Sequence, residues 1–170
     1  MQFVIEPHKG IGPISFGMSR EEVTAIMARN GGGIPKQRGR ATDCFFLNAF
    51  QVSFGDAGRA DFIEVASSLS AVVLFAGCDV FDMTADELLA LIQKQAKPDS
   101  ELSRPPYEFT FSDLILTLWD QNTQYDYKGG HLRPVFAAVG VGAPSYLAAI
   151  RDIRRRAKDR QMKRGDNVAA

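Results

Sequence analysis

The stretch "ISFGMSREEVTAIM", residues 14–27, decides how the first half of the chain folds. Ser19 is suited to begin a helix, because its hydroxyl can accept a hydrogen bond from a free backbone N–H of the first turn. Glu22 follows three residues later, where its carboxylate can reach back to the N–H of Ser19 and complete a capping box. Apolar residues then recur at the spacing of one buried helix face, at Val23, Ile26 and Met27. The stretch therefore predicts a helix that starts after Ser19.

The same pattern returns 65 residues later in "DVFDMTADELLALI", residues 79–92. Thr84 takes the place of Ser19 and Glu87 takes the place of Glu22, and the apolar stripe continues behind them. A local pattern that recurs at a fixed distance is typical of a duplicated structural unit. We therefore interpret both segments as parts of the scaffold that begin helices, and as poor candidates for an active site.

The segments that follow the two predicted helices also correspond. "FQVSFGD" (residues 50–56) and "LILTLWD" (residues 114–120) lie 64 residues apart, and both alternate apolar side chains with a period of two. This period is typical of strands with one buried face. Shorter strand-like segments flank both, so each unit predicts a capped helix followed by an antiparallel meander.

These elements predict an α+β fold of two tandem helix-plus-antiparallel-meander units, with a repeat of about 65 residues. The units span residues 1–70 and 71–142, and their sheet faces are expected to combine with the helices on one side. A C-terminal helix is expected at 144–160, where Pro144 suits its first turn. We expect residues 1–160 to form a single domain and residues 161–170 to be a flexible tail.

Charge, apolar runs and cysteine spacing argue against several classes of protein. The 170 residues include 20 basic and 20 acidic side chains, so no net charge steers the whole chain to nucleic acid or to a membrane. No apolar run reaches the roughly 18 residues of a membrane helix, and the first residues lack the pattern of a secretory signal. Cys44 and Cys78 stand alone, without the spacing of a zinc site or a redox pair, and are expected to be buried thiols. We therefore expect a cytoplasmic protein.

Residues 151–164 interrupt this neutral composition. They hold eight Lys or Arg and two Asp, a local charge of +6, so the rest of the neutral chain carries −6. A basic helix can bind RNA or DNA. A bare charge run without interleaved aromatic residues is more typical of a solvated face, and an acidic protein surface is as good a match as a nucleic acid. We expect nucleic acid not to be the partner.

The sequence contains no recognisable catalytic constellation. GxSxG, HExxH and P-loop motifs are absent, and the glycines of "GIGPISFG" (residues 10–17) lack the spacing of a dinucleotide site. We therefore predict no catalytic residue, no metal and no cofactor. The alternative is a small-ligand-binding protein or a hydrolase-like enzyme with its site in the groove between the units. Candidate side chains for such a site are Asp43, Asp61, Glu64 and His131.

The stretch "WDQNTQYDYKGGHLRP", residues 119–134, carries the best candidate for a binding surface. It predicts a loop of about ten residues, and loops of this length are often functional. Tyr and Trp dominate the hot spots of protein interfaces. Asp120 and Asp126 are expected to steer a basic partner toward the loop. The predicted partner-binding residues are Trp119, Tyr125, Asp126 and Tyr127.

The Phe-Gly-Met-Ser-x-x-Glu-Val pattern of residues 16–23, followed by a meander that ends in "FIE" (residues 62–64), resembles a scattered group of small uncharacterised bacterial proteins. Some of these proteins are thought to be immunity proteins encoded beside toxin genes. The duplicated plan is also similar to that of the tandem-repeat protein inhibitors of β-lactamase, although their disulfides and export signal are missing here. The resemblance implies a non-catalytic protein-binding module, such as an immunity-type inhibitor of a bacterial toxin or enzyme.

Overall fold

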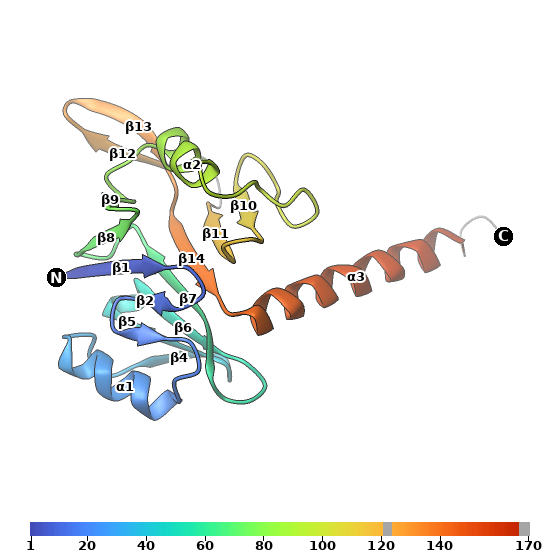
Figure 1. Ribbon diagram of the computed structural model, residues 1–170, viewed down its shortest axis with the longest axis horizontal. Coiled ribbons are helices and arrows are strands. Elements are labelled where there is room, and N and C mark those ends of the chain that lie inside the picture. The colour runs from blue at the N-terminus through green and yellow to red at the C-terminus, as the bar shows by residue number, and fades with distance from the viewer. Residues whose placement is uncertain (121–123, 167–170) are drawn as a thin grey trace.

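The computed structural model describes the backbone of residues 1–120 and 124–166, and the side chains of these residues as far as residue 160. A seven-stranded antiparallel sheet crosses the middle of the molecule (Figure 1). Two helices and a smaller sheet cover one of its faces, and the C-terminal helix leaves from the other. The predicted α+β class and C-terminal helix are confirmed.

The helices are α1 (Arg20–Arg29), α2 (Ala85–Gln93) and α3 (Pro144–Asp166), with a short 3₁₀ turn η1 (Phe46–Asn48). The large sheet has the order β10 (Glu108–Phe111), β11 (Leu116–Trp119), β14 (Ala138–Gly142), β7 (Ala60–Ala66), β6 (Phe50–Phe54), β5 (Thr42–Phe45) and β4 (Lys36–Arg38). The five-stranded sheet has the order β3 (Ile14–Ser15), β2 (Gly10–Ile11), β1 (Gln2–Glu6), β8 (Val72–Phe75) and β9 (Cys78–Asp79). A separate hairpin consists of β12 (Gln124–Lys128) and β13 (His131–Val135).

Both predicted capping boxes are confirmed. The Ser19 hydroxyl accepts a hydrogen bond from the Glu22 N–H at 3.2 Å, and the Glu22 carboxylate accepts one from the Ser19 N–H at 2.7 Å. Thr84 and Glu87 form the same pair of bonds at 3.3 and 2.8 Å. These reciprocal bonds satisfy N–H groups that the first helical turn leaves free, so they fix where α1 and α2 begin.

Removing either cap is expected to destabilise the protein. Ser19→Ala and Thr84→Ala should each lower the free energy of unfolding by about 1 kcal/mol, because each leaves a free N–H of the first turn without its partner. Urea unfolding followed by circular dichroism measures the loss. Thr24→Ala, inside α1, removes a hydroxyl where no cap bond exists, and is expected to leave stability equal or higher. A loss for Thr24→Ala as large as for Ser19→Ala would contradict this explanation.

The two halves of the chain meet in the middle of the large sheet. Strands β4 to β7 form the first meander, and β10, β11 and β14 come from the second half. The halves join where β7 pairs antiparallel with β14, with Val65 opposite Val139 and Ile63 opposite Val141. Strands from both halves of the chain therefore lie in one sheet.

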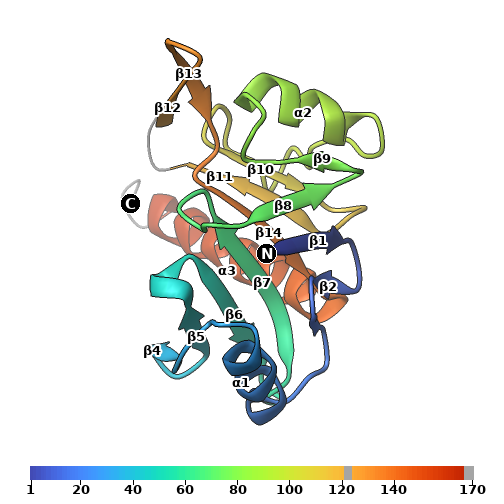
Figure 2. The same cartoon turned by 90° about the vertical axis from the view of Figure 1, so that its left-hand side faces the viewer.

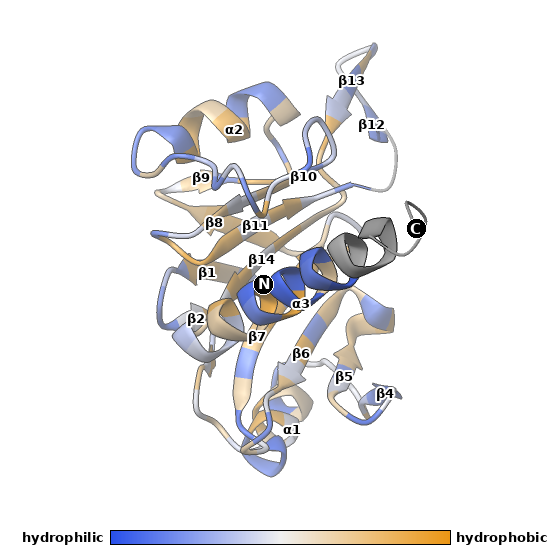
Figure 3. Cartoon of the chain, turned by 90° about the vertical axis from the view of Figure 1, so that its right-hand side faces the viewer, coloured by the Kyte–Doolittle hydropathy of each residue, from blue (hydrophilic) through white to orange (hydrophobic). Residues whose placement is uncertain are grey.

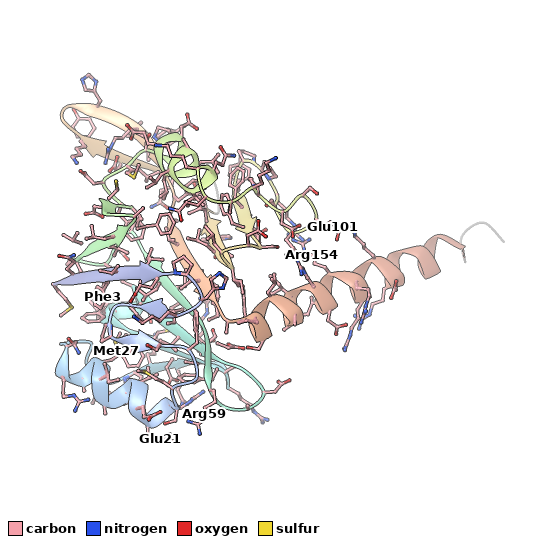
Figure 4. All side chains as sticks on the ribbon, viewed as in Figure 1. Phe3, Glu21, Met27, Arg59, Glu101 and Arg154 are labelled. Atoms are coloured by element: carbon pink, nitrogen blue, oxygen red, sulfur yellow. The ribbon has the colours of Figure 1, made fainter. Side chains whose placement is uncertain are left out.

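The core lies on the face of the large sheet that α1, α2 and the five-stranded sheet cover (Figure 2). Phe3 of β1 and Phe50 of β6 are fully buried, with ring centroids 5.3 Å apart. Met27 of α1 is buried in the same core, and Figure 4 shows it in the region between α1 and β1. Alpha-helix α2 contributes Leu88 and Ile92, the equivalent positions of its own stripe. The predicted apolar stripes therefore pack where the capping pattern places them.

The five-stranded sheet was not predicted from the sequence. Its centre is a parallel pair in which Phe3 of β1 lies opposite Val73 of β8. These strands are separated by about 70 residues of chain, and a parallel pair needs a long crossover connection. Local periodicity indicates that such segments are strands but not which strands pair.

The third helix packs on the face opposite to α1 and α2, the two unit helices that were expected on one side and do lie together. The ring of Tyr146 stacks on Phe62 of β7 with centroids 4.1 Å apart, and Phe62 points away from the core. Gly142 makes this approach possible, since a Cβ there would lie 2.5 Å from the Tyr146 ring. Beyond its first turns α3 projects outward from the large sheet, and its described outward part is mainly hydrophilic (Figure 3).

The predicted end of the C-terminal helix is wrong, because α3 continues past residue 160 to Asp166. The predicted flexible tail, 161–170, therefore begins inside the helix, and residues 167–170 lie outside the described residues. Within the described chain, none of the helices combines the length and the apolar character that crossing a membrane requires.

Candidate functional site

The predicted ten-residue loop is in fact a β-hairpin that projects from the body (Figure 1). Gly129 and Gly130 form its two-residue turn with φ of 59° and 82°. Two consecutive residues with positive φ match the twist of a hairpin, and glycine adopts them without steric cost. The loop prediction is wrong because it overlooked this signal. "QYDYK" and "HLRPV" flank the two glycines, and both segments can be read as strands.

One face of the hairpin exposes four apolar side chains. Tyr125 lies opposite Pro134 and Tyr127 opposite Leu132, so all four point to the same side. Tyr125 is 52% exposed, Tyr127 74% and Leu132 65%. We call this surface, made of Tyr125, Tyr127, Leu132 and Pro134, the hairpin face. Such a concentration of exposed apolar groups on a small element is typical of an interaction site.

The opposite side of the hairpin is held by charged groups. The Arg133 guanidinium donates to both carboxylate oxygens of Asp126 at 2.7 Å, and a third donor reaches the Asp82 carbonyl at 2.8 Å. Lys128 forms an ion pair with the Asp82 carboxylate. These contacts attach both strands of the hairpin to the segment before α2, so the hairpin face is presented in a fixed orientation.

The acidic residues of this region serve the fold. Asp120 is only 8% exposed and accepts a hydrogen bond from the Gln124 N–H at 2.6 Å. Little of the Asp120 side chain is therefore available for direct contact with a partner, and its role in steering a partner stays a prediction. The Asp126 charge is already balanced by Arg133, so this residue supports the hairpin from behind. Direct contact of Asp126 with a partner stays a prediction.

Trp119 does not belong to the hairpin. It is the last residue of β11, is 43% exposed, and lies opposite Ala138 of β14 and Glu108 of β10. Its side chain shares a face with Thr117, which is the α3 side of the large sheet. The predicted group of three aromatic residues thus divides into a pair on the hairpin and a single Trp on the sheet. Residues 121–123, between them, lie outside the described residues.

A small groove extends the hairpin face toward α2. Its volume is about 180 Å³, and Pro134 belongs both to this groove and to the hairpin face. Leu89 of α2 and Phe109 of β10 line it, together with the exposed ring of Tyr107. A partner that covers the hairpin face therefore meets further apolar surface beside it.

Sequence reasoning missed Leu132 and Pro134 as members of this surface. Both were read as the end of a loop, although they alternate with Arg133 in a strand pattern after the Gly-Gly turn. Pairing across that turn places them directly opposite the two tyrosines. The alternation was the signal that could have identified them.

The residues proposed for a catalytic or metal site do not converge. His131 is at the exposed tip of the hairpin, whereas Asp61 and Glu64 are on β7 and Asp43 is buried on β5. Across the described part of the chain, no three His, Cys, Asp or Glu side chains gather closely enough to hold a metal ion. Cys44 is buried as expected, but the same expectation for Cys78 is wrong, because its place in the short strand β9 leaves it exposed.

Asp61 and Glu64 nevertheless have unusual surroundings. Asp61 lines a groove of about 600 Å³ between the β6–β7 turn and the start of α3, and burial raises the pKa of its carboxyl. Glu64 accepts a hydrogen bond from the Gln51 amide at 3.3 Å. Burial raises the pKa of Glu64 as well, and the Arg38 charge opposes this rise.

Glu64→Gln is expected to raise the free energy of unfolding at pH 7. Since the folded-state pKa of Glu64 is raised above 4.5, its contribution to stability is complete below that pH and is lost as the pH rises through the folded-state pKa. The neutral amide avoids this loss, so the gain should shrink on going from pH 7 to pH 4. Thermal unfolding at both pH values measures it. A gain equal at the two pH values would show that ionisation is not its cause.

The basic residues of α3 are partly engaged inside the chain. Arg154 donates to the Leu102 carbonyl at 3.3 Å, and Lys158 pairs with Glu101 at 3.3 Å. Figure 4 shows Arg154 and Glu101 facing each other across the gap between α3 and the segment before β10. Arg151 lies 3.5 Å from Asp99. These contacts hold α3 to the body and reduce the positive charge available to a nucleic acid.

The chain matches no protein-family model, no curated protein and no solved structure.

Proposed function

We propose that the chain is a non-catalytic cytoplasmic module that binds another protein through the hairpin face. One observation carries this proposal: Tyr125, Tyr127, Leu132 and Pro134 are exposed on one side of a hairpin whose other side is fixed by ion pairs. Tyrosine supplies a large contact area with few rotatable bonds. A surface that is already ordered avoids much of the entropy cost of binding.

The partner class rests on the resemblance of the Phe-Gly-Met-Ser-x-x-Glu-Val segment to small bacterial proteins beside toxin genes. We therefore propose a bacterial toxin or enzyme as the partner, with the chain acting as an immunity-type inhibitor. The proposal includes a duplication of the helix-plus-meander unit. Support for it comes from the two capping boxes 65 residues apart and from the junction of the halves at β7 and β14.

The test is a binding measurement with the protein encoded beside the gene for this chain. The double variant Tyr125→Ser/Tyr127→Ser is expected to bind at least about 100-fold more weakly, because truncation of hot-spot aromatic residues typically costs 2 kcal/mol or more each. Ile34→Ser is the matched control, since Ile34 is 94% exposed but lies in the loop after α1. Calorimetric titration measures both affinities.

Two results would contradict the proposal. The first is a double variant that binds as tightly as the unmodified chain. The second is an equal loss of affinity in the Ile34→Ser control, which would show that exposed apolar side chains contribute to binding wherever they lie on the surface. Circular dichroism of each variant confirms that the fold is retained, so that lost binding is not mistaken for unfolding.

A small-ligand or hydrolase-like role is the alternative, and the groove beside Asp61 is the observation that favours it. The groove has room for a small molecule, and its half-buried carboxyl has a raised pKa, which is common at functional sites. A thermal-shift screen of small metabolites tests this role. A ligand that stabilises the unmodified chain but not Asp61→Asn would support it, and a screen without any shift would count against it.

A further inference from the structure

The two strands of the hairpin, β12 and β13, present the longest uncovered strand edges among the described residues. The outer edge of β10 is covered by the segment that precedes it. The backbone N–H of Asp99 donates to the Thr110 carbonyl, and the backbone N–H of Arg104 donates to the Glu108 carbonyl, both at 2.7 Å. Strand β4 has three residues, two of them basic, and β3 and β9 have two residues each. A short strand, basic side chains or a covering segment usually protect a strand edge from pairing with another chain. Strand β12 has five residues, and Lys128 at one end is its only basic side chain.

The register of the hairpin decides which backbone groups of β12 are free. In a hairpin with a two-residue turn, the residues that flank the turn form the first hydrogen-bonded pair, here Lys128 and His131. Such pairs alternate, so the next is Asp126 with Arg133. The N–H and C=O groups of Tyr125 and Tyr127 consequently point to the outer edge. Figures 2 and 3 show β13 on the side of α2 and β12 on the other side.

The other edge of the hairpin is less suited to pairing. Pro134 interrupts β13 and has no N–H to donate. An incoming strand therefore finds two free donors and two free acceptors along β12, and an incomplete set along β13. The hairpin directs strand addition to β12.

The side chains of β12 are complementary to a second copy of themselves. When two β12 strands run antiparallel about a two-fold axis at Tyr127, the two Tyr127 residues lie opposite each other. Asp126 of each copy, which also pairs with Arg133, then lies opposite Lys128 of the other, which also pairs with Asp82. No like charges meet across the strand pair in this register. The register centred on Asp126 would instead place two carboxylates face to face. Charge therefore favours the register centred on Tyr127.

We propose that the chain forms a symmetric dimer in which β12 pairs with β12 of a second copy. The four strands then run in the order β13, β12, β12, β13, and the hairpin faces of both copies join into one continuous apolar surface. The interface is built on a single strand pair, so it belongs among small and weak interfaces, with a dissociation constant on the order of micromolar. The dimer goes beyond the proposed function and does not depend on it.

Disulfide formation tests the pairing and its register together. In a Cys78→Ser background, which removes the exposed thiol, Tyr127→Cys is expected to give a disulfide-linked dimer on mild oxidation. The Cα atoms of a hydrogen-bonded pair are about 5.5 Å apart, which a disulfide spans. Tyr125→Cys is the matched control on the same face. It lies opposite Gly129 in this register, about 14 Å along the strand from its counterpart, and is expected not to form a disulfide-linked dimer.

Sedimentation equilibrium provides the second readout. The unmodified chain should shift from monomer to dimer between about 1 and 100 µM, and Tyr127→Lys should weaken association at least about tenfold by placing two positive charges at the axis. Tyr127 is 74% exposed, so this variant keeps the fold. A monomer at all concentrations, or a Tyr125→Cys variant that cross-links as fast as Tyr127→Cys, overturns the dimer. Loss of toxin or enzyme binding in the double tyrosine variant would still support the proposed function in that case.

Discussion

Replacing Arg20 with methionine is expected to lower the free energy of unfolding by about 3 kcal/mol at pH 7. Arg20 opens α1, and its guanidinium lies 3.1 Å from the Asp43 carboxylate of β5. Asp43 is only 1% exposed, so its carboxylate has little access to water that could replace the lost partner. The Arg20 side chain also covers the Phe54 ring, with 4.7 Å between its central carbon and the ring centroid. Methionine retains part of this packing but not the charge.

The loss should depend on pH. Burial raises the pKa of Asp43, and the Arg20 charge opposes this rise, so removal of Arg20 raises the pKa further. A carboxyl whose folded-state pKa is raised above its unfolded value of 3.8 destabilises the fold increasingly as the pH rises through the folded-state pKa. The difference between variant and unmodified chain should therefore be small near pH 4 and largest at pH 7. Urea unfolding at both pH values measures it.

The double variant Arg20→Met/Asp43→Asn is the control for this explanation. Without a carboxylate no buried charge is left alone, so the double variant should recover most of the loss at pH 7 and show little dependence on pH. A single Arg20→Met variant that is equally unstable at pH 4 and pH 7 would show that packing, not charge, is responsible.

Phe50→Ala is expected to lower the free energy of unfolding by about 4 kcal/mol. Phe50 is fully buried in β6, and its ring contacts the rings of Phe3 and Phe46 at centroid distances of 5.3 and 6.5 Å. These rings join β1, the 3₁₀ turn and the large sheet. Truncation therefore leaves a cavity at a point where three elements meet, and rigid strands on both sides limit how far the cavity can collapse.

Phe46→Ala is the matched control. Phe46 has the same side chain but is only partly buried, and its expected loss is roughly half as large because less apolar area returns to water. Chemical denaturation, analysed with one m-value for all variants, measures the loss in free energy of unfolding for Phe50→Ala and for Phe46→Ala. Equal losses for the two variants would mean that the ring cluster does not derive its strength from burial.

Local sequence signals predicted the elements that local interactions build. Ser19 with Glu22 and Thr84 with Glu87 lie within one helical turn, so their pattern can be read directly from adjacent residues. The pairing of β1 with β8 depends on segments about 70 residues apart, which periodicity cannot connect. The position of α3 depends on a contact between Tyr146 and Phe62 that Gly142 permits. Neither appears in any short window of the sequence.

Part of the candidate site could also be predicted from local sequence signals. Residue type alone identified Tyr125 and Tyr127 as candidate contact residues, and the structure places both in solvent. The pairing across the Gly129–Gly130 turn decided which residues accompany them, and this pairing was readable but overlooked. The burial of Asp120 depends on the neighbouring segment at the start of β10, where its N–H donates to the Tyr107 carbonyl at 2.8 Å, so residue type could not reveal it.

The central position of β1 in its sheet has a consequence for any attempt to divide the chain. Strand β8, from the second half, pairs with β1 of the first half, and β14 pairs with β7. A fragment cut near residue 70 would lose both of these strands at once and present two long open edges to other chains. The halves are therefore expected to aggregate when produced apart and to recover native structure only when mixed, in the manner of a complemented split protein.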